Sequence, residues 1–480
     1  MYCEHFVIVH FLRVNSTIPD TVKVQPLHSC TMANNGTMGQ LQPDEVNTLN
    51  RLLLPVLNKA QSLVKLDPHE KKQNVKILGA LLEHLCNQLK EMDPLFKLLY
   101  NRCLYSGSFY EDLRITSPNE FDINIVLVLS KATLQCELSC LHGNGAIIGC
   151  CVDEKQKNHR AVEELFSEFE GKYWLDITKV RRWFQSLLAR AKGFGDIEGV
   201  YDVKYSESGP AKTLYIFTTS GRIDVDLVPA FEFPSKGWTK KLATDARMLQ
   251  FMKKKQVDME NEKMCLVPKE HRTYHSPLYW RAHFPSVENK LMAAGGCLKP
   301  TIRLLKLFRD NLKWSQISSY ALKTLVILCA MENPDDYWDA KRHGIIFYEM
   351  LERLRQALHG PGIPYIYCSK VDLLQNCKHI ARENYACRLK VILRGIKSDP
   401  PSLMTYFVNE AAVSPSVENL RLAPESGTRV SSTGQDIPDI CPAYNEHTSD
   451  DHCSREDAPL LRGSSAGQQD GEGWKCCKIL

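Results

Sequence analysis

The spacing of apolar residues predicts two long helices near the start of the chain, followed by strands. Apolar residues recur every three or four positions across residues 44–65 and about 70–92, which is the period of an amphipathic helix. Asp67-Pro68 ends the first of these runs. The period then becomes two, and this alternation predicts strands at residues 121–129, 213–218 and 222–228.

The helical period returns at residues 176–191 and is the main pattern beyond Pro234. Four later segments each have one apolar face, at residues 286–294, 299–313, 318–331 and 340–358. From about residue 411 the chain is rich in Ser, Gly, Pro and Asp and has no period, which is typical of disorder. We therefore expect a poorly ordered segment at 1–43, an α/β lobe at 44–235, a helical lobe at 236–410 and a disordered acidic tail at 411–480.

Composition and charge narrow the class of protein. The 480 residues are 24% charged and 44% apolar, as in an ordinary globular protein. Every apolar run falls far short of the ~18 residues of a membrane-spanning helix, so the sequence excludes that class. The formal net charge of +4 hides an asymmetry, because residues 411–480 hold six Lys or Arg and eleven Asp or Glu. The rest of the chain is correspondingly basic, which leaves a polyanionic partner open.

The cysteines and the N-terminal residues indicate a cytoplasmic protein. The 18 cysteines lack the regular spacing of a secreted disulfide framework, so we expect reduced thiols. Glu4 precedes the N-terminal apolar stretch and His10 interrupts it, unlike in a signal peptide. Met32 and Met38 are alternative start residues.

One cysteine cluster has ligand types that suit zinc. Five such residues lie close together in the sequence, namely Cys136, Cys140, His142, Cys150 and Cys151. Their spacing matches no usual zinc template. We therefore expect free thiols here and no bound zinc.

The segment that most clearly indicates a chemical function is a predicted strand that carries two acidic residues. Glu120 and Asp122 alternate with apolar residues, so their carboxylates share one face of the strand. The second acidic strand could bring Asp226 beside them, with Asp224 as a further candidate. Carboxylates gathered in this way repel one another unless a divalent cation binds, and all-oxygen ligands favour Mg²⁺ or Mn²⁺. Two such ions can activate a sugar hydroxyl and stabilise a leaving pyrophosphate.

A Gly-Ser pair precedes this strand. Gly107 lets the backbone approach a triphosphate closely, and Ser108 adds a hydroxyl donor. The alternative is that the acidic residues only solvate an edge strand. The combination of Gly-Ser with two acidic strands favours a nucleotidyl-transfer site.

The motifs around these residues resemble a known family. The segment GSFYEDLRITSPNEFDINIVL closely resembles the cyclic GMP-AMP synthase-like receptors, within the Mab-type nucleotidyltransferase superfamily. The resemblance covers roughly residues 70–400 and continues through VDLVPAFEF (225–233), WRAHFPSVENKL (280–291), IRLLKLFRDNLK (302–313) and SSYALKTLVILCAMENP (318–334). It implies a bilobed α/β nucleotidyltransferase fold, with a twisted mixed sheet, a long spine helix and a helical C-terminal lobe.

The resemblance also implies roles for individual residues. It makes Glu120, Asp122 and Asp226 the catalytic metal ligands, and Ser106, Gly107 and Ser108 the triphosphate cradle. It implies that Arg281 and Glu288 contact nucleotides, that Lys306 and Ser319 hold phosphates, and that Tyr320 stacks on a base. Taken without the resemblance, Arg281, Lys306 and Tyr320 would be ordinary structural residues.

The activating ligand is inferred from a segment in which this sequence differs from the vertebrate DNA sensor of the family. The vertebrate DNA sensor of this family has a zinc-binding thumb inserted before the helix that carries the Lys306 position. In this chain the corresponding residues, 291–303, contain no such insertion and no set of His and Cys ligands. This favours double-stranded RNA over double-stranded DNA. Candidate phosphate contacts are the basic residues Lys71, Lys72, Lys76, Lys253, Lys254 and Lys255. A solvated helix face or loop is an equal alternative for each of them.

The chain ends in a candidate lipidation box. Cys477-Lys478-Ile479-Leu480 fits the prenylation pattern, and its terminal Leu favours geranylgeranyl, although Lys478 is not aliphatic. Because one lipid anchors weakly, Cys476 is a candidate for palmitoylation, and together they would attach the protein peripherally to a membrane. A chance ending is the alternative.

These observations predict an enzyme of innate immune, antiviral signalling. It would sense double-stranded RNA and join ATP and GTP, or other nucleoside triphosphates, into a cyclic dinucleotide similar to cyclic GMP-AMP. Two alternatives stay open: a non-catalytic Mab-type binding protein, and a template-independent synthetase of linear oligonucleotides. The bases, the 2′ or 3′ linkage and the oligomeric state do not follow from the sequence.

Overall fold

The computed structural model describes residues 42–141, 144–206, 212–236, 246–268, 276–293 and 295–408. These residues all belong to one compact unit. Several sequence predictions lie outside the described residues, among them the tail at 411–480 with Cys476 and Cys477, and His142 in the cysteine cluster.

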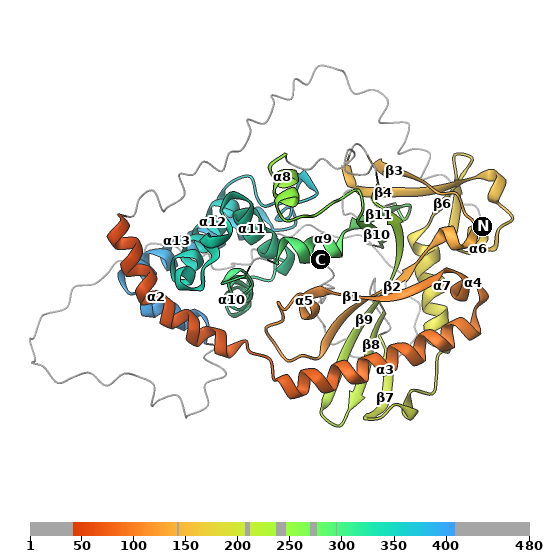
Figure 1. Ribbon diagram of the computed structural model, residues 1–480, viewed down its shortest axis with the longest axis horizontal. Coiled ribbons are helices and arrows are strands. Elements are labelled where there is room, and N and C mark those ends of the chain that lie inside the picture. Colours follow the sequence, from red (N-terminus) through yellow and green to blue (C-terminus); the bar gives the residue numbers. More distant parts are fainter. Residues whose placement is uncertain are drawn as a thin grey trace, which may run out of the picture. The chain divides into compact units, whose positions relative to one another are not determined.

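The two predicted N-terminal helices are present and are followed by a short third one. They are α2 (Pro43–Leu63), α3 (Pro68–Met92) and α4 (Pro94–Leu99). α3 is the predicted spine helix, and the Asp67 carboxylate caps it by accepting a hydrogen bond from the Glu70 backbone N–H. Figure 1 shows α3 crossing in front of strands β8 and β9.

α2 belongs by packing to the later helices. It contacts α10, α12 and the 3₁₀ segment η8 (Pro400–Tyr406). The Asn50 side chain fixes this packing, because it donates to the Lys341 carbonyl and accepts from the Ile345 N–H. The lobe boundary at residue 44 stays a prediction, but this contact joins the first described helix to residues some 290 positions away.

A large mixed sheet forms the other part of the fold, as predicted. Its strand order is β1-β2-β9-β10-β11-β4-β6-β5, with β3 paired to β4, β8 to β9 and β7 to β8. The pairing of β2 with β9 is parallel, and the other pairings in this sheet are antiparallel among the described residues. The strands are β1 (Tyr100–Ser106), β2 (Glu120–Leu127), β3 (Glu137–Leu141), β4 (Asn144–Asp153), β5 (Phe166–Phe169), β6 (Lys172–Leu175), β7 (Val200–Tyr205), β8 (Lys212–Thr218), β9 (Gly221–Pro234), β10 (Lys263–Val267) and β11 (Tyr279–His283).

Two short helices and one longer helix accompany these strands. They are α5 (Gly107–Tyr110), α6 (Arg160–Leu165) and α7 (Ile177–Arg190). α7 confirms the helix predicted at 176–191, and the Asp176 carboxylate caps it through the N–H groups of Thr178 and Lys179.

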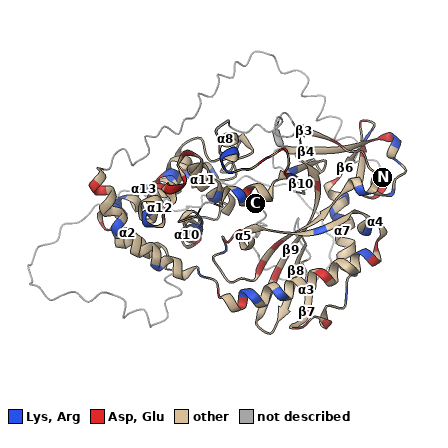
Figure 2. Cartoon of the chain, in the orientation of Figure 1, with Lys and Arg blue, Asp and Glu red and all other residues tan. Residues whose placement is uncertain are grey.

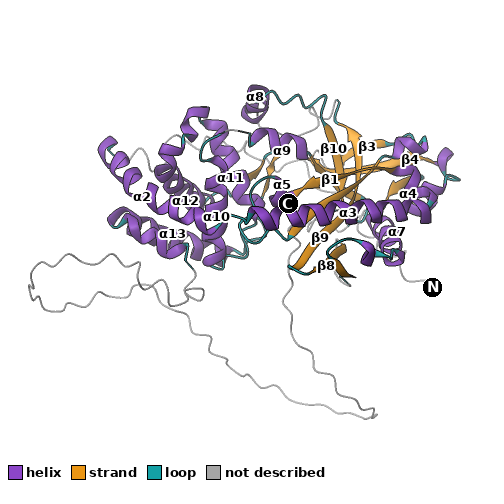
Figure 3. Ribbon diagram, turned by 60° about the horizontal axis from the view of Figure 1, so that its bottom comes forward, coloured by secondary structure: helices purple, strands orange, loops and turns teal. Residues whose placement is uncertain are grey.

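The C-terminal part is helical, as predicted. Its helices are α8 (Ala246–Lys254), α9 (Pro285–Leu291), α10 (Leu298–Asn311), α11 (Ser319–Glu332), α12 (His343–His359) and α13 (His379–Ser398), with a small hairpin of β12 (Pro364–Tyr365) and β13 (Cys368–Asp372). Figure 3 shows α10, α11, α12 and α13 packed against one another. α13 was not among the predicted helices, although its buried residues recur at helical spacing, namely Ala386, Leu389, Ile392, Leu393 and Ile396. Within the described ranges, no helix is both long and apolar enough to cross a membrane.

Candidate active site

The predicted acidic residues meet because β2 and β9 pair in parallel. The register sets Asp122 opposite Asp226 and Glu120 opposite Asp224. Residues opposite each other on neighbouring strands point to the same face. The structure therefore brings Glu120, Asp122 and Asp226 to one face of the sheet, as the alternation predicted.

The carboxylates on this face have different partners. Glu120 Oε2 accepts a hydrogen bond from Arg114 at 2.5 Å. Asp226 Oδ1 accepts one at 2.5 Å from Thr213, its neighbour on β8. Asp122 Oδ1 is buried without a partner. Asp224, the further candidate, instead forms an ion pair with the Arg222 side chain at 2.7 Å.

Burial and mutual repulsion disfavour charge on this face. Burial raises the pKa of Asp122 to about 8, and the carboxylates of Asp226 and Glu120 add to the shift while Arg114 opposes it. Burial also raises the pKa of Asp226, against the hydrogen bond from Thr213. A group that is costly to ionise in this way gains most from a bound cation.

The donor set fits a magnesium or manganese ion, although its side chains do not converge. Among the described residues, no three His, Cys, Asp or Glu side chains are grouped closely enough to hold a metal ion. The partners of Glu120 and Asp226 explain this, because each carboxylate is turned toward its own hydrogen bond. The unpaired, buried Oδ1 of Asp122 and the all-oxygen set still match what these hard ions require.

Gly107 lies directly against Asp122. Its φ of +76° is a conformation that favours glycine, and a Cβ there would lie 1.8 Å from Asp122 Oδ2. Ser106 pairs with Asp122 across β1 and β2, and its hydroxyl donates weakly to the Asp122 carbonyl at 3.3 Å. The predicted cradle of Ser106, Gly107 and Ser108 therefore adjoins the acidic face.

The segment after this cradle is held by two cations from helix α10. Arg303 on α10 donates to the carbonyl of Asp112 at 2.9 Å. Lys306, one turn further along α10, donates to the carbonyl of Leu113 at 2.6 Å. The predicted phosphate contact Lys306 is thus bound to the backbone beside the cradle, and it is 6% exposed.

A buried charge cluster lies next to this segment. Lys323 on α11 donates to Glu111 at 2.9 Å and to Glu288 on α9 at 2.5 Å. The Tyr320 hydroxyl donates to the other oxygen of Glu288 at 3.0 Å. Burial lowers the pKa of Lys323, but the carboxylates of Glu111 and Glu288 outweigh it and hold this pKa above its usual value.

Sequence reasoning missed Glu111 and Lys323. Lys323 is the one charged residue in the apolar run from Tyr320 to Met331, and a lysine in such a run is rarely buried unless it is paired. That signal could have identified Lys323, but nothing in the sequence marks Glu111 as its partner.

The other predicted nucleotide contacts are placed as follows. Tyr320 and Glu288 face each other and are 6% and 0% exposed, so they form an internal pair. Ser319 accepts a hydrogen bond from Arg309 at 3.0 Å. Arg281 is half-buried on β11, opposite Ile147 of β4 and Val267 of β10. Their roles toward nucleotides stay predictions.

The predicted nucleic-acid contacts fall in two places. Lys71, Lys72 and Lys76 lie in the first turns of α3, where Figure 2 shows a run of basic residues. The Lys71 ammonium lies 5.3 Å from the centre of the Phe109 ring, and Lys76 pairs with the exposed Glu198. Of the second group, Lys254 and Lys255 share one carboxylate, that of Asp335, at 3.6 and 2.7 Å, while Lys253 precedes them on α8.

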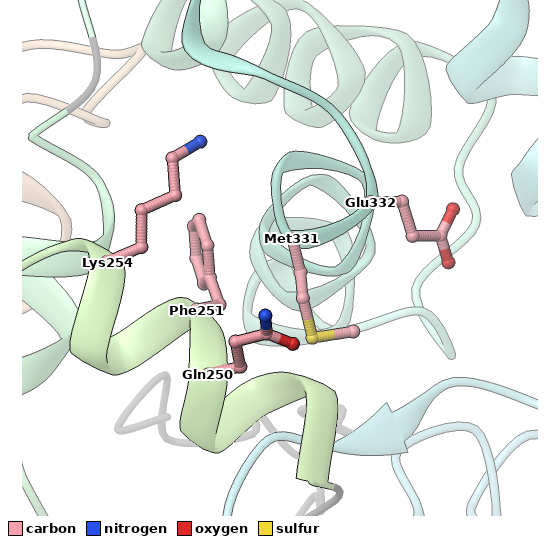
Figure 4. Close-up of a pocket in the computed structure, with 5 residues that line it drawn as sticks. All are labelled: Gln250, Phe251, Lys254, Met331 and Glu332. Atoms are coloured by element: carbon pink, nitrogen blue, oxygen red, sulfur yellow. The ribbon is translucent and has the colours of Figure 1, made fainter.

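One pocket of about 380 Å³ lies away from the acidic face. It is formed by α8 and the end of α11, and its lining is Gln250, Phe251, Lys254, Met331 and Glu332 (Figure 4). It contains none of the predicted catalytic or nucleotide-binding residues. The described members of the cysteine cluster, Cys136, Cys140, Cys150 and Cys151, form no disulfide with one another or with another described cysteine.

Replacing Gly107 by Ala tests the close approach to Asp122. The added Cβ overlaps the carboxylate and the positive φ disfavours Ala, so we expect the free energy of unfolding to fall by about 1–3 kcal/mol. Urea denaturation measures the change. Gly79→Ala is the matched control, because nothing lies within 4 Å of that helical position, and it is expected to stabilise slightly. Equal effects of the two substitutions would contradict the geometry.

Replacing Lys323 by Met tests the buried cluster. Two carboxylates then lose their buried cation, so the free energy of unfolding is expected to fall by about 3–5 kcal/mol. Adding Glu288→Gln should recover part of this loss, because it removes one unpaired charge. Lys390→Met on the exposed side of α13 is the control and should be nearly neutral. A small loss for Lys323→Met would mean that the cluster contributes little to stability.

Comparisons with known proteins agree with this geometry. The Mab-21 protein nucleotidyltransferase domain matches residues 109–294, and the Mab-21 protein HhH/H2TH-like domain matches residues 297–391. A cyclic GMP-AMP synthase-like receptor of Aethina tumida is 27% identical over 370 residues, which are 72% of this chain and 89% of the relative. A receptor of the same name from Tribolium castaneum is 24% identical over 375 residues, again 72% and 89%.

A more distant match extends the relationship to vertebrates. The cyclic GMP-AMP synthase of Sus scrofa is 25% identical over 336 residues, which are 65% of each chain. The two matched domains together span the acidic face and the helices α9, α10 and α11, and the first match begins directly after the cradle, at residue 109. The chain therefore belongs to the Mab-21 nucleotidyltransferase family and is a distant homologue of the insect cyclic GMP-AMP synthase-like receptors.

Proposed function

We propose that this protein is a nucleotidyltransferase that makes a cyclic dinucleotide from nucleoside triphosphates when double-stranded RNA binds. The observation that carries the proposal is the acidic face, where Glu120, Asp122 and Asp226 stand in register on adjacent strands. Gly107, which tolerates no side chain, lies against the central carboxylate. Such a face beside a glycine backbone suits a metal-bound triphosphate.

The roles of the acidic residues follow from their partners. Glu120, Asp122 and Asp226 would hold Mg²⁺ or Mn²⁺, which when bound supplies positive charge to the triphosphate and activates the attacking hydroxyl. Thr213 orients Asp226, and Arg114 orients Glu120 and balances its charge.

The nucleotide contacts would come from the helices. We assign phosphate binding to Lys306 and Ser319, with Arg281, Glu288 and Tyr320 as further nucleotide contacts. Stacking of a base on Tyr320 requires its ring to become exposed. We therefore infer that the pair of Tyr320 and Glu288 opens when nucleotides bind.

The reaction would join two nucleotides in two rounds. A sugar hydroxyl of one nucleotide attacks the α-phosphate of the other and pyrophosphate leaves, and a second round closes the ring. ATP and GTP are the proposed substrates, since the relatives are named as cyclic GMP-AMP synthase-like receptors. We place this activity in the cytoplasm and in innate immune signalling, with lipidation of Cys477 and Cys476 as a means of peripheral membrane attachment.

A non-catalytic Mab-21 protein is the second candidate. It is favoured by two observations. Among the described residues the carboxylates do not converge on a metal site, and the Glu288–Tyr320 pair is buried. A binding protein would keep these side chains for stability only. Product formation separates the two candidates.

The first experiment is mass spectrometry of products. Purified full-length protein is incubated with all four triphosphates and Mg²⁺ or Mn²⁺, with no ligand, duplex RNA or duplex DNA. We expect a cyclic dinucleotide with RNA, and a loss of at least about 100-fold in Asp122→Asn because the central ligand loses its charge. Asp224→Asn is the matched control and should keep most activity, since Asp224 pairs with Arg222.

The other outcomes separate the alternatives. A linear ladder of products would indicate an oligonucleotide synthetase. No product under any of these conditions, with duplex RNA still bound, would favour the non-catalytic candidate.

Charge reversal on α3 tests the RNA contact. Lys71, Lys72 and Lys76 are replaced together by Glu, and duplex RNA binding is measured by fluorescence anisotropy at several salt concentrations. If all three contact phosphates, the slope of log affinity against log salt should fall by up to about 3. Lys390→Glu on the exposed side of α13 is the control, and it should leave the affinity and the slope nearly unchanged. An unchanged affinity and slope would remove α3 from the binding surface.

A further inference from the structure

Two cysteines meet where the spine helix packs on the first strand of the sheet. Cys86 lies on the buried face of α3 and Cys103 lies in the middle of β1. Their Sγ atoms are 3.6 Å apart, and both are free thiols. A contact this close is within hydrogen-bond reach for sulfur, and it joins two elements that flank the candidate active site.

An irregularity at the start of β1 brings the Tyr100 side chain next to this pair of cysteines. Side chains three positions apart in a regular strand point to opposite faces. The pairing of β1 with β2 has an irregularity between Tyr100 and Arg102, which allows Tyr100 and Cys103 to share one face. The Tyr100 hydroxyl lies 3.6 Å from Cys103 Sγ, and the Lys90 ammonium lies 4.7 Å from the centre of the Tyr100 ring.

These neighbours make the two thiols chemically different. The hydrogen bond with Cys86 lowers the pKa of Cys103 to about 7, with help from Tyr100 and Lys90 and against the effect of burial. The same hydrogen bond, together with burial, raises the pKa of Cys86. A thiolate beside a protonated thiol is the arrangement in which one sulfur reacts first and the other resolves the product. By contrast, burial raises the pKa of the isolated Cys265 to about 12.

We propose that Cys86 and Cys103 form an oxidation site, at which a hydroperoxide converts the two thiols into an intramolecular disulfide. The Cys103 thiolate attacks one peroxide oxygen, the O–O bond breaks, and the departing hydroxide is protonated to water. The Cys86 sulfur then attacks the resulting sulfenic sulfur, the S–O bond breaks, and the second hydroxide takes the remaining thiol proton. Two thiols and one hydrogen peroxide thus give one disulfide and two waters.

The geometry permits this reaction with a small movement. A disulfide bond is about 2.05 Å long, so the two sulfurs need to approach by roughly 1.5 Å. Cys103 is half-buried, which gives a small peroxide access to it, whereas Cys86 is 3% exposed. The bond would fix α3 to β1 only three residues before Ser106. Oxidation would therefore restrain the spine helix against the strand that leads into the candidate cradle, whether or not the proposed function is correct.

Peptide mapping of the oxidised full chain tests the site. Reduced protein is treated with hydrogen peroxide near pH 7.5, blocked with iodoacetamide and digested with trypsin. We expect the peptide Ile77–Lys90 linked to the peptide Cys103–Arg114 as the main cross-linked product, with a mass about 2 Da below the sum of the two reduced peptides. Dithiothreitol should separate them. Amide hydrogen exchange of the oxidised protein should be slower in α3 and β1.

Matched variants show whether the link depends on this pair. Cys103→Ser and Cys86→Ser should each abolish the linked peptides, while Cys265→Ser should leave them unchanged. Because the mapping is decisive on the natural chain, a variant that fails to fold does not prevent the test. The proposal is overturned if other cysteines oxidise while the two peptides stay unlinked, for example if the disulfide forms within the single tryptic peptide Ala132–Lys155, which contains both Cys136 and Cys150.

Discussion

The parallel pairing of β2 with β9 is the constraint on which the candidate site depends. Parallel neighbours need a long crossover between them, and here the chain from β3 to β8 supplies it. Buried residues such as Phe121, Ile123 and Val225 fix the register on the opposite face of the two strands. A slip of one residue would send the carboxylates of β2 and β9 to opposite faces, so the apolar core sets the geometry of the acidic face.

A buried lysine places a second constraint on the candidate site, because it must have acidic partners. Lys323 is 3% exposed and is satisfied only because Glu111 and Glu288 come from two other parts of the chain. Removing the cation would leave two buried carboxylates without their ion-pair partner, which is costly. The consequence is that the helices and the segment after the cradle are joined at the same place where nucleotides are proposed to bind. Binding at this site therefore has to exchange contacts that also stabilise the fold.

The sequence anticipated much of this arrangement where the signal was local. The alternation of Glu120 and Asp122 with apolar residues identified β2 and the face of its acids. It did not decide between Asp224 and Asp226, because both fall on the same face of β9. Their partners differ, since Arg222 forms an ion pair with Asp224 whereas Thr213 from β8 donates a hydrogen bond to Asp226. Tyr320 shows a similar limit, since its position in α11 was evident but its bond to Glu288 was not.

The sequence by itself determined the helices and strands with clear periods, the basic character of the first 410 residues, and the positions of the acidic and Gly-Ser residues. These are properties of neighbouring residues, which the local pattern records. Tertiary structure alone decided that α2 packs with the C-terminal helices, that Lys323 joins Glu111 to Glu288, and that Cys86 meets Cys103. Each of these contacts joins residues from different elements. Their proximity depends on strand register, a bulge and side-chain packing, none of which has a signature in the local sequence.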